Sequence, residues 1–199
     1  NKKIYEDDKL EPVNVYGETK KVCEEIIQTY SRVNKFNYII LRYFNAAGAD
    51  TDGELGEDRQ NETHLIPLIF RSIKNNTPIN IFGNDYDTRD KTCIRDYIHV
   101  LDIGRAHIKS LFFLKKNKKS LIFNLGTGKG LSVLEIVNIT SEIINKKIKY
   151  KFLNRRKGDP AYLVASSEKI KKKLNFENKY SYPKVIIKTA WEWFKYKKK

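Results

Sequence analysis

Tyr16 and Lys20 lie four residues apart near the start of the chain. Residues at this spacing share one face of an α-helix, so the ammonium of Lys20 can lie beside the phenol of Tyr16. A neighbouring positive charge stabilises the ionised form of a phenol and lowers its pKa. The pair could therefore take a proton from a sugar hydroxyl near neutral pH.

The elements around the pair decide whether this spacing is more than chance. After Lys20, apolar side chains recur at helical spacing, which predicts an amphipathic helix of about four turns. Residues 38–41 predict a buried strand, and small residues up to Gly48 would let backbone approach a ligand closely. This order is typical of a doubly wound α/β sheet, whose binding sites lie at the carboxyl ends of its strands.

The rest of the chain alternates between expected helices and strands. The predicted helices cover residues 65–73, 100–116, 133–145, 166–174 and 183–194, and the predicted strands or extended segments cover 79–82, 92–98 and 148–152. Ser132 and Glu135 have the spacing of a capping box. The side chains expected on the buried side of the helix at 100–116 are Ile103, Ala106, His107, Ser110, Leu111 and Leu114. Asp85, Asp96 and Asp102 are interpreted as turn and cap residues.

Composition and charge exclude several classes of protein. Cys23 and Cys93 show no metal-ligand or disulfide spacing, so no metal is expected. No apolar run approaches the ~18 residues of a membrane span and no signal peptide is visible, which indicates a cytoplasmic protein without membrane contact. The net charge is +15, but the lysines gather at expected helix ends and turns, so no nucleic-acid partner is expected.

Several short runs follow one another in an order that chance does not produce. They are ETHLIP at 62–67, IFGNDY at 81–86, RDYIHV at 95–100, FNLG at 123–126 and RRKGDPA at 155–161. With the Tyr–Lys pair and the LRYFN run at 41–45, the chain resembles the extended short-chain dehydrogenase/reductases, and within them the branch of UDP-glucose 4-epimerases. The resemblance covers nearly the whole chain.

The resemblance implies a fold and a division into domains. The expected fold is the C-terminal part of a doubly wound parallel, Rossmann-type sheet that merges with a smaller α/β substrate lobe. Residues 1–49 would complete the NAD-binding domain and carry the Tyr–Lys helix. Residues 50–199 would form mainly the UDP-sugar lobe, with segments at about 79–125 returning to the NAD-binding sheet.

The resemblance also implies a reaction and its residues. UDP-glucose and UDP-galactose would be interconverted through a 4-keto intermediate, with NAD as cofactor and Tyr16 as the base beside Lys20. Tyr16, Lys20, Tyr43 and Phe44 would contact the cofactor. The residues expected to bind the substrate are Asn45, His64, Leu65, Asn80, Ile81, Phe82, Arg95, Arg156, Asp159 and Leu163.

Physical roles can be attached to some of these positions. Arg95 and Arg156 would clamp the diphosphate, because a guanidinium matches phosphate oxygens bidentately. Asp159 would accept the ribose hydroxyls. The position beside the hexose falls at Leu163 if the spacing from Asp159 is kept without a gap, or at Tyr162 if one residue is skipped. We prefer Leu163, which leaves acceptance of acetamido-sugars open.

No glycine-rich pyrophosphate loop occurs in these 199 residues, and residues 126–130 are interpreted as a sheet-to-helix turn. We therefore expect this chain alone to be inactive and to represent the C-terminal portion of an enzyme that forms a homodimer when complete. Two alternatives stay open. One is another nucleotide-sugar epimerase or a 4,6-dehydratase, and the other is a non-catalytic nucleotide-sugar-binding or interaction fragment.

Overall fold

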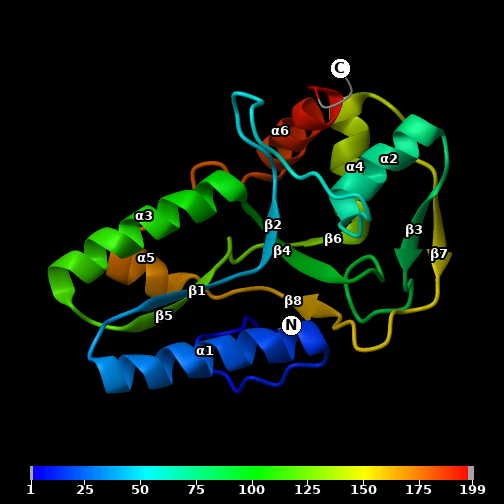
Figure 1. Ribbon diagram of the computed structural model, residues 1–199. Coiled ribbons are helices and arrows are strands. Elements are labelled where there is room, and N and C mark those ends of the chain that lie inside the picture. The colour runs from blue at the N-terminus through cyan, green and yellow to red at the C-terminus, as the bar shows by residue number, and fades with distance from the viewer. Residues whose placement is uncertain (1, 197–199) are drawn as a thin grey trace.

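The computed structural model of the protein describes residues 2–196 (Figure 1). Its helices are α1 (Val15–Asn34), α2 (Leu65–Asn75), α3 (Val100–Asn117), α4 (Val133–Ile144), α5 (Glu168–Leu174) and α6 (Pro183–Tyr196). Its strands are β1 (Ile39–Tyr43), β2 (Asn45–Ala47), β3 (Ile79–Phe82), β4 (Ile94–His99), β5 (Leu121–Leu125), β6 (Gly130–Ser132), β7 (Tyr150–Leu153) and β8 (Tyr162–Leu163).

The strands pair mostly in parallel, which confirms the predicted α/β class. β1 pairs with β5, and β3 pairs with β7. β4 lies in the centre of a third sheet, parallel to β2 and β8 and antiparallel to β6. In Figure 1, α1 lies on one side of the β1–β5 pair and α3 lies on the other. The third sheet connects this layer to the group formed by α2, α4 and α6.

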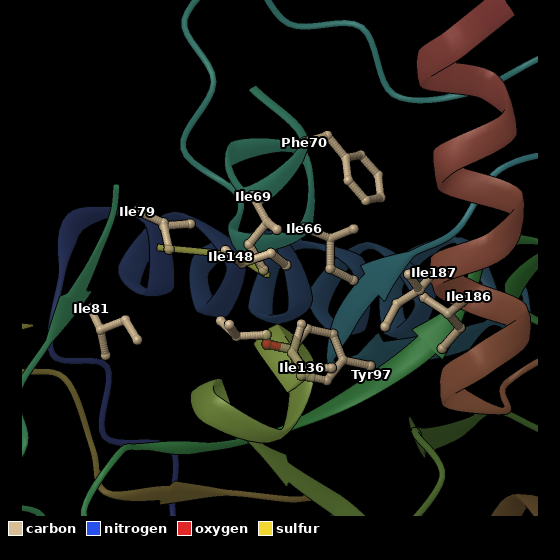
Figure 2. Close-up of a cluster of buried hydrophobic side chains, with 11 residues drawn as sticks. Ile66, Ile69, Phe70, Ile79, Ile81, Tyr97, Ile136, Ile148, Ile186 and Ile187 are labelled. Atoms are coloured by element: carbon tan, nitrogen blue, oxygen red, sulfur yellow. The ribbon is translucent and has the colours of Figure 1, made fainter. Parts of the chain in front are cut away.

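Two apolar cores hold these layers together. The larger core lies among α2, α4, α6 and the strands beside them, as Figure 2 shows. Its buried side chains are Ile66, Ile69, Phe70, Ile79, Ile81, Tyr97, Ile136, Val137, Ile148, Ile186 and Ile187. The second core packs α3 and α5 against β1 and β5 through Ile98, Ala106, Phe123, Leu125, Ile170, Leu174 and Phe176. Full burial of one such large apolar side chain stabilises the fold by ~1.5–3 kcal/mol.

One buried carboxylate joins two distant segments of the chain. The carboxylate of Asp102 is fully buried and accepts hydrogen bonds from the backbone N–H groups of Lys179, Tyr180 and Ser181 and from the Ser181 hydroxyl. Arg105 pairs with the same carboxylate at 2.6 Å. Asp102 therefore fixes the chain just before α6 onto the start of α3.

The predicted capping box of α4 is confirmed, whereas the predicted buried face of α3 is partly wrong. Ser132 and Glu135 form the capping box of α4. On α3, Ala106 and Ser110 are buried as expected, but His107 is exposed and Leu111 is 67% exposed. The buried stripe of α3 runs from Asp102 through Ala106 to Ser110, and Ile103 and Phe113 pack beside it against the core, so His107 and Leu111 lie outside the buried stripe. No helix within residues 2–196 is long and apolar enough to cross a membrane.

Candidate functional site

A cavity of about 830 Å³ opens where β2, β3 and β4 meet the N-terminus of α2 and the C-terminal part of α6. Every site residue predicted from the sequence lines this cavity except Lys20. These lining residues are Tyr16, Tyr43, Phe44, Asn45, His64, Leu65, Asn80, Ile81, Phe82, Arg95, Arg156, Asp159 and Leu163. Leu163 lines the cavity, and Tyr162 is not among the lining residues.

The Tyr–Lys pair lies in the first turns of α1. The Asn14 side chain caps this helix by accepting a hydrogen bond of 2.8 Å from the N–H of Gly17. Lys20 Nζ lies 5.3 Å from the centre of the Tyr16 ring, so the charge and the phenol share one helix face. Tyr16 is 70% exposed and borders the cavity from the α1 side. A substrate hydroxyl in the cavity could therefore reach the phenol.

The positively charged side of the cavity is formed by Arg95 on β4 and Arg156 after β7. Arg95 is buried, donates to the carbonyl of Ile94 at 2.7 Å and forms an ion pair with Asp159. The guanidinium carbon of Arg156 lies 4.0 Å from the centre of the Phe82 ring, which is a cation–π contact. Two guanidinium groups therefore line the cavity, and Asp159 neutralises the charge of Arg95.

The backbone between β1 and β2 forms the opposite wall. Tyr43 ends β1 and Asn45 begins β2, so Tyr43, Phe44 and Asn45 lie at the carboxyl end of a parallel strand. Phe44 is held by a 3.1 Å hydrogen bond from its N–H to the carbonyl of Leu125. This position agrees with the rule that ligands of such sheets bind at the carboxyl ends of the strands.

Comparison with known proteins agrees with this geometry. The model of the family described as "Epimerase: NAD dependent epimerase/dehydratase family" matches residues 2–126. The chain belongs to this family.

Curated relatives are similar over almost the whole chain. It is 43% identical over 193 residues to a UDP-glucose 4-epimerase of Halalkalibacterium halodurans and 45% identical over 193 residues to one of Lactobacillus helveticus. Each match covers 96% of this chain and 58% of the relative. The chain therefore spans a little more than half the length of the curated relatives it matches.

Solved structures share the fold. The UDP-glucose 4-epimerase of Brucella ovis in complex with NAD is 41% identical with a TM-score of 0.91, over 96% of this chain and 59% of that one. The enzyme of Bifidobacterium longum in complex with NAD+ and UDP is 30% identical with a TM-score of 0.90, over 98% of this chain and 58% of that one.

In this member of the epimerase/dehydratase family, His64 lies at the N-cap of α2 and pairs with Glu57 at 2.6 Å. Arg59 contacts the same Glu57 oxygen at 3.1 Å. The ligand atoms of Glu57, Glu62 and His64 lie within 4.8 Å of one another, an arrangement that the sequence reading did not anticipate. Because Arg59 supplies a positive charge to Glu57, the cluster is already neutralised in part.

Trp193 is a second lining residue that the sequence reading did not include in the site. Its indole N–H donates to the carbonyl of Glu57 at 3.0 Å, and a Cβ at Gly56 would lie 2.2 Å from the ring. Trp191, two residues earlier, packs on Phe70 in the core instead, with ring centres 5.1 Å apart. The spacing along α6 could indicate that the two rings face different ways, but not that one of them meets the cavity.

In the turn at residues 126–130, the N–H groups of residues 127–129 donate to acceptors within the chain. The N–H groups of Thr127 and Gly128 donate to the carboxylate of Asp96 at 2.9 and 3.0 Å. Ala165 donates to the same carboxylate at 3.2 Å, and burial raises the pKa of Asp96. Asp96 of β4 therefore holds this turn and the segment after β8 together.

Proposed function

We propose that the protein, at its full natural length, interconverts UDP-glucose and UDP-galactose as an NAD-dependent 4-epimerase. The observation that carries the proposal is that the phenol of Tyr16 and the guanidinium groups of Arg95 and Arg156 line one cavity. A phenol beside an ammonium suits proton transfer from a hexose, and two guanidinium groups suit a diphosphate. The named activities of the relatives support the same reaction.

The aromatic side chains near Tyr16 fit the nicotinamide end of the cofactor. Tyr16, Lys20, Tyr43 and Phe44 would hold that end, since Tyr43 and Phe44 offer ring surface at the cavity. NAD, when bound, supplies the acceptor for a hydride from C4 of the hexose and returns it. The chain offers no glycine-rich loop for the pyrophosphate, so the fit concerns the nicotinamide end alone.

Tyr16 would perform the proton transfers of the reaction. Its side-chain oxygen, with Lys20 on the same helix face, would take the proton of the hexose 4-hydroxyl as C4 becomes a ketone, and would return the proton after the ketone has turned over. For this rotation the hexose must be held loosely and the nucleotide firmly. The charged side chains of Arg95, Arg156 and Asp159, which line the cavity, are suited to hold the nucleotide firmly.

Leu163 bears on the choice of sugar. It lines the cavity, whereas the bulkier Tyr162 is absent from the lining residues. An aliphatic side chain beside the hexose leaves more room than a tyrosine would, so UDP-N-acetylglucosamine is a substrate to test beside UDP-glucose.

The domain division and the dimer are part of the proposal. The parallel pairing of β1 with β5 and of β2 with β4 supports the return of the 79–125 region to the NAD-binding sheet. The dimer would form through α1, whose outer residues Val22, Ile26 and Tyr30 are 47%, 57% and 63% exposed. An apolar helix face of this kind requires a partner surface.

The experiment is a conversion assay on the full-length protein with UDP-galactose, combined with titration of UDP by calorimetry. We expect UDP-glucose to form, and we expect Arg156→Ala to weaken UDP binding by ~2–5 kcal/mol because a charge-assisted contact is lost. Absence of conversion in a folded, NAD-loaded protein would contradict the proposal. Unchanged UDP affinity in both Arg95→Ala and Arg156→Ala would contradict the diphosphate clamp.

A further inference from the structure

Two loops leave the same end of the parallel β3–β7 pair (Figure 1), and Arg156 and Asp159 in one of them line the cavity. The first loop begins at Gly83, directly after β3, and the second spans residues 154–160, between β7 and β8. The register pairs Phe82 with Leu153, and the N–H of Gly83 continues the ladder by donating to the carbonyl of Leu153 at 2.8 Å. The sheet therefore brings the starts of both loops together.

Arg155 joins the second loop to the first on the outer side. Its Nε donates to Asp85 Oδ1 at 2.7 Å, and its Nη2 donates to the backbone carbonyl of Asp85 at 2.5 Å. Its guanidinium carbon also lies 4.2 Å from the centre of the Tyr86 ring. Tyr86 is 1% exposed and thus fixed by its surroundings. One side chain therefore makes a salt bridge, a backbone contact and a cation–π contact with a single turn.

Gly83 makes the close approach of the two loops possible. Its φ is +84°, and a Cβ there would lie 2.4 Å from the Tyr86 ring and 2.9 Å from Cγ of Arg155. A residue with a side chain would be strained at this positive φ. Its Cβ would also collide with the Tyr86 ring and with the aliphatic part of Arg155. The contact between the loops is thus built into the backbone as well as into the side chains.

The next residue, Arg156, points to the other side and carries the ligand-facing part of the same loop. Its guanidinium lies over the Phe82 ring in the cavity, and its carbonyl accepts a 3.2 Å hydrogen bond from the N–H of Asp159. Asp159 in turn pairs with Arg95. The contacts of Arg155 with the Asp85 turn and those of Arg156 in the cavity are therefore made by neighbouring residues of one short, exposed loop.

We infer that Arg155 is a positioning residue, which with Asp85 and Tyr86 holds the 154–160 loop so that Arg156 faces the nucleotide diphosphate and Asp159 faces the ribose. The inference rests on the proposed function for the identity of the ligand. Without these contacts the loop must be ordered when the ligand binds, and the lost conformational freedom lowers affinity. Chemistry is unaffected, because Tyr16 and Lys20 lie on α1.

The first test compares Arg155→Gln with Lys157→Gln in the full-length protein. Both changes remove one positive charge from the same exposed loop, but only Arg155 contacts the Asp85 turn. We expect Arg155→Gln to weaken UDP binding roughly 5- to 20-fold and to raise KM for UDP-galactose similarly, with kcat within about 2-fold and Tm unchanged. Lys157→Gln should weaken binding by less than about 2-fold. Equal losses in the two variants would overturn the inference.

Asp85→Asn distinguishes a positioning role of Arg155 from simple charge attraction, because the two explanations predict changes of opposite sign in UDP affinity. Removing a negative charge near an anionic ligand would tighten binding if only Coulomb attraction mattered. The positioning role instead predicts roughly 2- to 5-fold weaker UDP binding, since the salt bridge to Arg155 is lost. Asp87→Asn, at an exposed acid two residues away, is the matched control. Tighter binding or no change in Asp85→Asn would contradict the positioning role.

A measurement without ligand keeps the inference separate from the proposed function. Hydrogen exchange of peptides covering 154–160 should be faster in Asp85→Asn and Arg155→Gln than in Asp87→Asn and Lys157→Gln, while peptides of β3 and β7 stay protected. Unchanged exchange in the first two variants would overturn the inference even if the protein epimerises UDP-sugars. Faster exchange in a protein that fails to bind UDP would leave Arg155 as the residue that fixes the loop and would reject the proposed function alone.

Discussion

β4 and α1 border the same cavity but differ completely in burial. All six residues of β4 are buried, whereas no residue of α1 is. The charged groups on and after β4 are satisfied inside the chain, as the contacts of Arg95, Asp96 and Asp102 show. Within residues 2–196, by contrast, α1 leaves Ile26 and Tyr30 in solvent. The cavity wall that contains Arg95 and Asp159 is thus formed and paired within the chain, while α1, which carries Tyr16 and Lys20, keeps an apolar face that the described residues do not cover.

The largest expected difference between the buried region and α1 is in the free energy of unfolding. Asp102→Ala should lower the free energy of unfolding by ~3–5 kcal/mol, because it leaves Arg105 without its partner and the N–H groups of residues 179–181 without an acceptor. Ile26→Ala, on the open face of α1, should change it by less than ~0.5 kcal/mol. Urea unfolding of both variants under conditions where the protein is monomeric measures the two values.

Similar losses in the two variants would remove the distinction between a closed and an open region. A large loss for Ile26→Ala that depends on protein concentration would instead show that α1 is covered by a second copy, as the proposed homodimer requires. Sedimentation of Ile26→Ala beside the unchanged protein separates these outcomes.

The next largest effect concerns catalysis on the open side. In the full-length protein, Tyr16→Phe should lower turnover of UDP-galactose by ~10²-fold or more if Tyr16 is the proposed base, because a general base acts in the transition state, and should leave UDP affinity nearly unchanged. Its unfolding free energy should also be unchanged, because Tyr16 is 70% exposed. Near-normal turnover in steady-state assays would show that another group is the base.

The same two regions explain what could be predicted from the sequence. Signals within a few residues were reliable: the capping box of Ser132 and Glu135 and the Tyr16–Lys20 face are both present. Motifs of a known family placed distant residues such as Arg156 and Leu163 on one cavity.

Contacts between distant segments could not be read in this way. Asp102 was interpreted as a turn or cap residue, but its partners lie 77 to 79 residues further along the chain. The prediction that Leu111 is buried was wrong for the same reason. Which side of α3 is buried is decided by its packing against β1, β5 and α5, which lie elsewhere in the sequence. The contact of Arg155 with Asp85 spans 70 residues and joins two loops without periodic pattern.

The smallest expected effect is a pH dependence of the closed region through His99. Its ring is fully buried, Nδ1 accepts a 3.1 Å hydrogen bond from the N–H of Leu101, and Nε2 lies 3.0 Å from the hydroxyl of Thr189. Burial lowers the pKa of His99 below its usual 6.5, although Asp102 and Asp50 oppose this in part. Protonation would also put a hydrogen on Nδ1, where it now accepts one.

The sign of that dependence follows from the lowered pKa. Above pH 6.5 the ring is neutral in both the folded and the unfolded chain, so His99 makes no difference. As the pH falls below 6.5, the unfolded chain binds the proton first, and stability is lost until the pH passes the lower folded-state pKa. Asp96 acts in the opposite direction, because burial raises the pKa of its carboxyl and acid favours its folded form. Urea unfolding between pH 7.5 and 5 should therefore show a smaller acid loss in His99→Gln than in the unchanged protein, since both retain Asp96. An equal acid loss in the two proteins would mean that His99 can accept a proton in place, and that the closed region is less tightly packed around it than its contacts indicate.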